Sequence, residues 1–214
     1  MNISRIDVSQ TILASGFIFG KLIWEQVSYG KLDKLLSGIY SNKAHMNNTV
    51  YIALGSNIEN REENLSLAIE LMPPDVIPVS CSPVYQTPPW GFIDQPAFLN
   101  QVVKAKTDLE PEDLLQYLKK LENKIGRQPT FQYGPRQIDL DILFYNDIVF
   151  DSPCLTIPHP RIAERAFVLV PLADIAADYT HPKLLVPVNE LLDGVNVEGI
   201  DWYSSGVCGK MEGN

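Results

Sequence analysis

Two aspartates lie two positions apart in the segment 136–142, which reads RQIDLDI. Side chains alternate along a strand, so Asp139 and Asp141 would share one face about 7 Å apart, while the apolar residues between them face the other way. Two carboxylates this close repel each other unless a cation lies between them. Mg²⁺ prefers one or two carboxylates together with substrate phosphates. The pattern predicts a magnesium site, although a solvated strand face would also accept two aspartates.

Basic side chains gather just before this pair in the sequence. Arg127 and Arg136 flank the polar loop that leads to the aspartates. Arginine binds phosphate oxygens through two parallel hydrogen bonds and stabilises charge that develops during phosphoryl transfer. Three lysines precede the loop on a predicted helix whose opposing charge is Glu122: Lys119, Lys120 and Lys124. The cluster suits a polyphosphate, and the lysines alone would also fit a solvated helix face.

Two further groups of residues suit a flat heterocycle and its phosphates. Phe98 and Asn100 share a strand face, where a stacking ring lies beside an amide that both donates and accepts; Phe98 would also fit a core position. The preceding loop, 87–91, reads TPPWG and is stiffened by its prolines, so its backbone groups can be held toward a ligand. Downstream, His159 and Arg165 could reach a triphosphate, although a surface histidine taken alone is more often incidental.

The elements that must position these residues follow the order strand, helix, strand, strand, helix, strand. Hydrophobic periodicity, caps and turn residues predict strands over 49–54, 76–86, 97–107 and 136–145, and helices over 60–72 and from Pro111 to Gly126. Asn146 and Asp147 are expected to turn the chain into a further short strand. This order is typical of an α+β, ferredoxin-like βαββαβ sandwich, in which an antiparallel sheet has helices on one face.

The chain of 214 residues is long enough for one domain with an appendage. Residues 1–46 carry more basic than acidic side chains, whereas the whole chain has a net charge of −9. We therefore expect an N-terminal extension of unknown role over 1–46, or an over-long start. The domain that carries the candidate site is expected over 47–193, followed by a loose, glycine-rich tail over 194–214.

The composition argues against some kinds of binding partner and favours one cellular compartment. The acidic balance argues against a nucleic-acid partner, because such proteins usually carry a basic field. The apolar run 12–19 is too short to span a bilayer, so no membrane partner is expected. Cys81, Cys154 and Cys208 show no metal spacing and are predicted to be three reduced thiols in a cytoplasmic protein. A monomer is the simplest expectation, although the sequence does not decide the oligomeric state.

Five short motifs together resemble one family. In order along the chain, they are ALGSN at 53–57, TPP at 87–89, FLN at 98–100, GPR with DLD at 134–141, and PHPR at 158–161. Each is common alone, but the joint pattern is similar to hydroxymethyl-dihydropterin pyrophosphokinase of folate biosynthesis over about residues 49–182. The family has the ferredoxin-like fold, which the element order also predicts.

The resemblance implies a reaction and a role for each matching residue. The pterin hydroxymethyl oxygen attacks the β-phosphorus of ATP, pyrophosphate is transferred and AMP leaves. Asp139 and Asp141 would hold two Mg²⁺ ions, and these aspartates with Arg127 and Arg136 would form the catalytic set. The residues implied at the ATP site are Lys119, Glu122, Arg127, Arg136, Ile142, His159 and Arg165. Those implied at the pterin site are Thr87, Pro88, Trp90, Phe98, Asn100, Tyr133, Asp139 and Phe167.

The sequence departs from the family pattern in the loop before Arg136. The loop is about one residue shorter than is usual, and Pro129 and Gln132 stand where basic residues are common. Tyr133 replaces a tryptophan that closes over the site, and Lys119 replaces a glutamine. These changes bear on loop closure and rate more than on the type of reaction.

Two other classes of function remain open at this point. A glycosyltransferase or nucleotidyltransferase with a DxD motif would use the same metal chemistry, but the acidic balance and short chain disfavour it. A non-enzymatic ferredoxin-like module would explain the fold and leave the aspartates and arginines without a role. Production of AMP that depends on a reduced pterin separates the pyrophosphokinase from both.

Overall fold

The computed structural model describes residues 46–131, 133–206 and 208. The predicted N-terminal extension, apart from Met46, and Gln132 lie outside these residues. Within them, no helix has both the length and the apolar character that crossing a bilayer requires.

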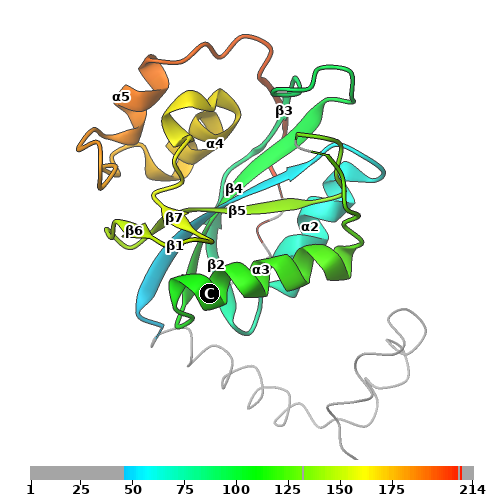
Figure 1. The fold of residues 1–214 in the computed structure, drawn as a ribbon. Coiled ribbons are helices and arrows are strands. Elements are labelled where there is room, and N and C mark those ends of the chain that lie inside the picture. The colour runs from blue at the N-terminus through cyan, green and yellow to red at the C-terminus, as the bar shows by residue number, and fades with distance from the viewer. Residues whose placement is uncertain (1–45, 132, 207, 209–214) are drawn as a thin grey trace, which may run out of the picture. The chain divides into compact units, whose positions relative to one another are not determined.

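A twisted antiparallel sheet forms the centre of the fold (Figure 1). The order of its strands is β5-β1-β4-β3-β8, and β2 also pairs with β4 beside β3. Its strands are β1 (Asn48–Ser56), β2 (Val76–Cys81), β3 (Val84–Thr87), β4 (Phe98–Thr107), β5 (Asp139–Tyr145) and β8 (Asp201–Ser204). Long strands β1 and β4 lie at the centre, where each is paired on both sides. Their backbone is therefore rigid and can hold side chains in fixed positions.

Two helices of the βαββαβ core cover one face of the sheet. Helix α2 (Arg61–Leu71) and helix α3 (Pro111–Ile125) bury an aliphatic cluster against β1, β4 and β5. Pro111 suits the first turn of α3, and Gly126 ends the helix with a φ of 110°, which favours glycine. The predicted ferredoxin-like fold, with its helices on one face, is confirmed for this core.

A second layer lies on the opposite face and was not predicted. Helix α4 (Ala166–Ala176) and helix α5 (Val188–Asp193) pack there on Tyr51, Val102 and Phe144, and a 3-10 turn, η1 (Ile162–Glu164), leads into α4 (Figure 1). Helix α4 is apolar nearly all round, so its sequence lacks the periodicity that marks a surface helix. Helices thus cover both faces of the sheet. On the face where α4 and α5 pack, however, one end of the sheet is left uncovered.

Several predicted strand boundaries differ from the structure, and the strand predicted over 136–145 begins only at Asp139. The predicted strand 76–86 is divided into β2 and β3 at Ser82 and Pro83, because proline lacks the amide that the ladder requires. The turn at Asn146 is present, but the strand after it, β6 (Phe150–Asp151), pairs with β7 (Thr156–Ile157) and not with β5. These two short strands form a separate sheet that leads the chain toward η1.

The C-terminal segment is more ordered than expected. The predicted loose tail is wrong for Asp201–Ser204, which form β8 and pair with β3, since β3 would otherwise expose an unpaired edge. The prediction of three reduced thiols is wrong for Cys81 and Cys208, which form a disulfide across 127 residues of sequence. Spacing along the chain could not reveal this proximity. Cys154 is free and exposed, as expected.

We predict that Tyr117→Phe lowers the free energy of unfolding by about 1 kcal/mol, the usual net value of one hydrogen bond. The Tyr117 hydroxyl, on α3, donates to the carbonyl of Met72 at 2.8 Å and so ties α3 to the end of α2. Urea unfolding of both proteins measures the difference. Tyr203→Phe, at an exposed tyrosine on β8, is the matched control and should change little. Equal effects of the two substitutions would contradict the assignment.

Candidate active site

A pocket lies on the sheet face that α4 and α5 cover only in part, beside the N-terminus of α4. Strands β1, β4 and β5 form its floor, and the loop after β3, the loop before β5 and the first turn of α4 form its walls. Its lining residues are Ala53, Leu54, Gly55, Thr87, Pro88, Trp90, Phe98, Asn100, Gln101, Tyr133, Arg136, Asp139, Asp141, Arg165, Phe167 and Val168. One cavity therefore combines aromatic rings with carboxylates and guanidinium groups.

Most of the residues predicted for ligand binding meet in this pocket, and the other five lie outside its lining. Lys119, Glu122 and Arg127 line a second, more open cavity between α3 and the loop after it. His159 lies beside Arg165, at 3.5 Å between ring nitrogen and guanidinium. Ile142 belongs to the aliphatic core under α3, with 3% of its surface exposed. Its side chain is therefore turned away from both cavities.

The two aspartates lie on β5 as the alternation of side chains predicts. Asp139 is opposite Gly55 and Asp141 is opposite Ala53 in the register with β1. Ile138 and Leu140 are fully buried in the aliphatic core on the other face. No group of three or more His, Cys, Asp and Glu side chains suited to a metal comes together in the described part of the chain. A metal at this pair would need ligands from a substrate.

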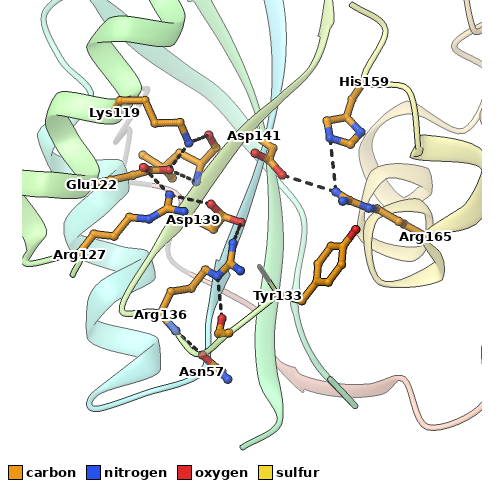
Figure 2. Close-up of polar contacts among 12 residues, drawn as sticks. Asn57, Lys119, Glu122, Arg127, Tyr133, Arg136, Asp139, Asp141, His159 and Arg165 are labelled. Carbon is orange, nitrogen blue, oxygen red and sulfur yellow. Dashed lines mark hydrogen bonds and ion pairs between the residues drawn. The ribbon is translucent and has the colours of Figure 1, made fainter. Parts of the chain in front are cut away.

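Asp139 is held between two arginines (Figure 2). One carboxylate oxygen accepts from Arg127 at 2.8 Å, and the other accepts from Arg136 at 2.7 Å. Burial by itself raises the pKa of Asp139, but the charges of Arg136, Arg127 and Lys119 outweigh burial and lower the pKa below its ordinary value. Asp139 is therefore an anion throughout the neutral range.

Glu122 anchors the basic cluster from α3. It is 2% exposed and forms ion pairs with Lys119, at 2.7 Å, and with Arg127. One of its oxygens also accepts from the amide of Leu140 on β5 at 2.8 Å. Burial lowers the pKa of Arg127, but Asp139 and Glu122 more than offset burial and raise it. Because its carboxylate has these partners, Glu122 positions Arg127 relative to Asp139.

Asp141 faces the third arginine, Arg165, at 3.5 Å. Arg165 precedes α4, and its Nε is buried without a hydrogen-bond partner among the described residues. Burial lowers the pKa of the neighbouring His159; Asp141 opposes this, whereas Arg165 and Arg161 add to it. The net direction is down, so His159 is neutral near pH 7. This corner of the pocket therefore carries the positive charge of Arg165 and a buried donor without a partner.

The other end of the pocket is aromatic and polar. Asn100 donates to the hydroxyl of Thr87 at 2.7 Å, and this fixes which way its amide points. A Cβ at Gly55 would lie 3.1 Å from the Asn100 side-chain oxygen, so glycine is needed for this close approach. Phe98 and Phe167 line the same space, and Trp90 meets Tyr133 edge to face at 5.3 Å between centroids. These groups can accept a flat ring with polar edges.

Two residues that connect the walls of the pocket had no predicted role. Asn57, at 1% exposure, donates to the Gln95 side chain and the Pro96 carbonyl, and it accepts from the amide of Arg136 at 2.8 Å. Gln95 in turn donates to the carbonyl of Tyr133 at 2.8 Å. Asn57 belongs to the ALGSN motif. That motif contributed to the family resemblance, but it predicted no role for Asn57. Gln95 gave no such signal, because only the fold brings it to Asn57.

The chain is similar to proteins of folate synthesis. The model of one protein family, 7,8-dihydro-6-hydroxymethylpterin-pyrophosphokinase, matches residues 51–177. A 2-amino-4-hydroxy-6-hydroxymethyldihydropteridine pyrophosphokinase of Aquifex aeolicus is 42% identical over 66% of this chain and 89% of its own length. The folic acid synthesis protein FOL1 of Dictyostelium discoideum is 40% identical over 72% of this chain. The match spans only about a quarter (24%) of that longer relative.

Solved structures with the same fold include an HPPK-DHPS in complex with substrates, with a TM-score of 0.58 and 14% identity over 69% of this chain and 44% of that one. A Plasmodium falciparum HPPK-DHPS with pteroate has a TM-score of 0.54 at 18% identity, over 69% of this chain and 42% of that one. At these identities the likeness concerns the fold alone. Together with the family match, it shows that the chain belongs to the 7,8-dihydro-6-hydroxymethylpterin-pyrophosphokinase family of folate biosynthesis, as the five sequence motifs predicted.

Proposed function

We propose that this chain transfers pyrophosphate from ATP to the hydroxymethyl group of 6-hydroxymethyl-7,8-dihydropterin and releases AMP, with two Mg²⁺ ions at Asp139 and Asp141. The single observation that carries the proposal is the composition of the main pocket. Aromatic rings and an oriented amide line the same cavity as two carboxylates and two arginines, and Arg165 lies 5.4 Å from the Trp90 ring and 5.6 Å from the Phe167 ring. A flat pterin and a triphosphate can therefore lie in one cavity with their reacting ends together.

The aromatic end would bind the pterin. Phe98 and Phe167 offer faces on which a ring can stack, and Asn100, held by Thr87, offers an amide oxygen in a fixed direction. The backbones of Pro88 and Trp90 lie at the same end. Tyr133 would cover this end of the pocket. Because these groups are fixed before the ligand arrives, little ordering is needed on binding.

The charged end would bind the phosphates of ATP. Arg136 and Arg165 reach the pocket directly, and the buried Nε of Arg165 would gain its missing acceptor from a phosphate oxygen. Arg127 lines the second cavity beside Lys119 and Glu122 while it contacts Asp139, so it joins the two cavities. ATP would extend from one into the other. Neutral His159 would serve as a hydrogen-bond partner, and any contact from Ile142 would come through its backbone.

The aspartates fit magnesium by their chemistry. Each oxygen of Asp139 accepts one hydrogen bond from an arginine, and an ionised carboxylate offers about four acceptor sites, so acceptor capacity remains. Two carboxylates without a third protein ligand suit a cation whose other ligands are phosphates and water. Bound there, magnesium would neutralise the charge on the triphosphate and help to align it. The chain itself would hold the two substrates in register and keep its guanidinium groups directed at the phosphates.

An assay with ATP, Mg²⁺ and 6-hydroxymethyl-7,8-dihydropterin tests the function directly. AMP release is followed by chromatography, and omission of pterin or magnesium supplies the controls. We expect AMP only when both are present. AMP formed without pterin, or no AMP from folded protein that binds ATP, would contradict the proposal. The monomeric state and the cytoplasmic location remain predictions.

We predict that Asp139→Asn and Asp141→Asn each lower the rate of AMP formation roughly a thousandfold, the upper range for removal of one electrostatic contact in a transition state. The shape of each side chain is kept, so circular dichroism should stay unchanged. Asp178→Asn, at an exposed position after α4, is the matched control and should retain full activity. Near-normal turnover of both aspartate variants would exclude the metal assignment.

We predict that Glu122→Gln raises the KM for ATP about tenfold and lowers the free energy of unfolding by about 3–5 kcal/mol, because a buried ion pair loses one partner. The amide still accepts from Leu140, so the effect reports the charge that holds Arg127 and Lys119. Glu112→Gln, exposed in the first turn of the same helix, is the control. Steady-state kinetics and urea unfolding measure both changes. An unchanged KM for ATP would show that Glu122 does not position the phosphate site.

A further inference from the structure

Arg161 lies where three segments of the chain meet at the edge of the pocket. Its guanidinium carbon is 5.4 Å from the centre of the Trp90 ring and 5.8 Å from that of Tyr133. One of its nitrogens also donates to the Tyr133 hydroxyl. Its own backbone amide donates to the ring of His159 at 3.2 Å, which fixes the turn before η1. A single side chain thus contacts both loops that form the walls of the pocket.

These two loops belong to different parts of the sequence. The Trp90 loop joins β3 to β4, and the Tyr133 loop joins α3 to β5. Apart from Arg161, they touch through the Trp90–Tyr133 ring pair, through Phe92 against Phe131 at 5.1 Å, and through the Gln95 side chain that donates to Tyr133. Gly91 approaches Tyr133 so closely that a Cβ there would lie 3.0 Å from the ring.

The partners of Arg161 differ from those of the other arginines around the pocket. Arg127, Arg136 and Arg165 each pair with a carboxylate on β5, whereas no carboxylate lies within ion-pair distance of Arg161 in the described ranges. Its planar group is instead held by aromatic faces and a phenol oxygen, an arrangement that lysine cannot reproduce. The contact to Tyr133 needs a hydroxyl, and tryptophan at this position would not supply one.

We propose that Arg161 is a positioning residue that holds the Trp90 and Tyr133 loops together over the pocket and so sets how fast the bound pterin leaves. The identity of that ligand rests on the proposed function. Arg161 reaches neither aspartate, and it is absent from the lining of the pocket. Its loss should therefore loosen the cover and leave the transfer step itself intact.

The first test measures, without any ligand, how stably the Trp90 and Tyr133 loops are held together. In Arg161→Gln and in Tyr133→Phe, hydrogen exchange at the amides of Gln95, Gly134 and Arg136 should be roughly tenfold faster than in the unchanged protein, as expected for one lost charged contact. All three amides donate within or next to the loops. Lys183→Gln, at an exposed cation before α5, is the control. Unchanged exchange in both variants would overturn the proposal.

The second test follows the ligand. In stopped-flow fluorescence with a non-hydrolysable ATP analogue, pterin should dissociate about tenfold faster from Arg161→Gln and also faster from Tyr133→Phe. Single-turnover AMP formation at saturation by Arg161→Gln should stay within about threefold of the unchanged protein. The double variant should release pterin no faster than Arg161→Gln alone, because that substitution already removes the hydrogen bond to the Tyr133 hydroxyl. Additive effects, or an equal loss in the single-turnover rate, would overturn the proposal.

The Arg161→Lys variant shows whether slow pterin release depends on the planar guanidinium group or on its positive charge alone. It keeps the cation, so normal pterin release from this variant would mean that positive charge suffices without the planar group, which would also overturn the proposal. Thermal unfolding shows whether each variant is folded. If the unchanged protein forms no AMP with pterin, the proposed function fails, and hydrogen exchange still decides the role of Arg161.

Discussion

The ionic contacts of Asp139 connect the parts of the site. Arg127 comes from the end of α3, Arg136 from the loop before β5, and Asp139 from β5 itself, so one carboxylate fixes three segments. Glu122 completes the arrangement from inside α3, because it binds Arg127 and the amide of Leu140 at once. The same contacts that place the helix against the strand also direct two guanidinium groups toward the region proposed for the phosphates. Packing and the proposed function therefore share these contacts, and one cannot be altered without the other.

The two faces of the sheet have different tasks. One face is filled with aliphatic side chains from α2 and α3, and it supplies the rigidity on which the site depends. The other face is covered by α4 and α5 only in part, and the pocket lies where this cover stops. Because side chains alternate along β5, Leu140 packs in the aliphatic core, whereas Asp139 and Asp141 face the pocket. Precise placement of the carboxylates follows from burial of their neighbours.

Sequence reasoning predicted those parts of the fold that depend on local pattern. The alternation of Asp139 and Asp141 and the glycine that ends α3 are local signals, and the structure agrees with them. Helix α4 could not be found in this way, since a helix that is apolar nearly all round has no periodicity to detect. The pairing of β8, the disulfide between Cys81 and Cys208, and the link from Asn57 through Gln95 to Tyr133 join distant residues, and no spacing rule encodes them. The roles of the site residues came from the family resemblance and await experiment.

Gly55 has a consequence for inhibitors of this protein. At this point the floor of the pocket is bare backbone, and a methyl group there would press on the amide oxygen of Asn100. An inhibitor that fills the space above Gly55 would occupy a position where the protein has little freedom to change. A larger side chain would exclude the drug, but it would also displace the amide that the natural substrate is expected to need. Resistance by substitution at this residue would therefore carry its own loss of fitness.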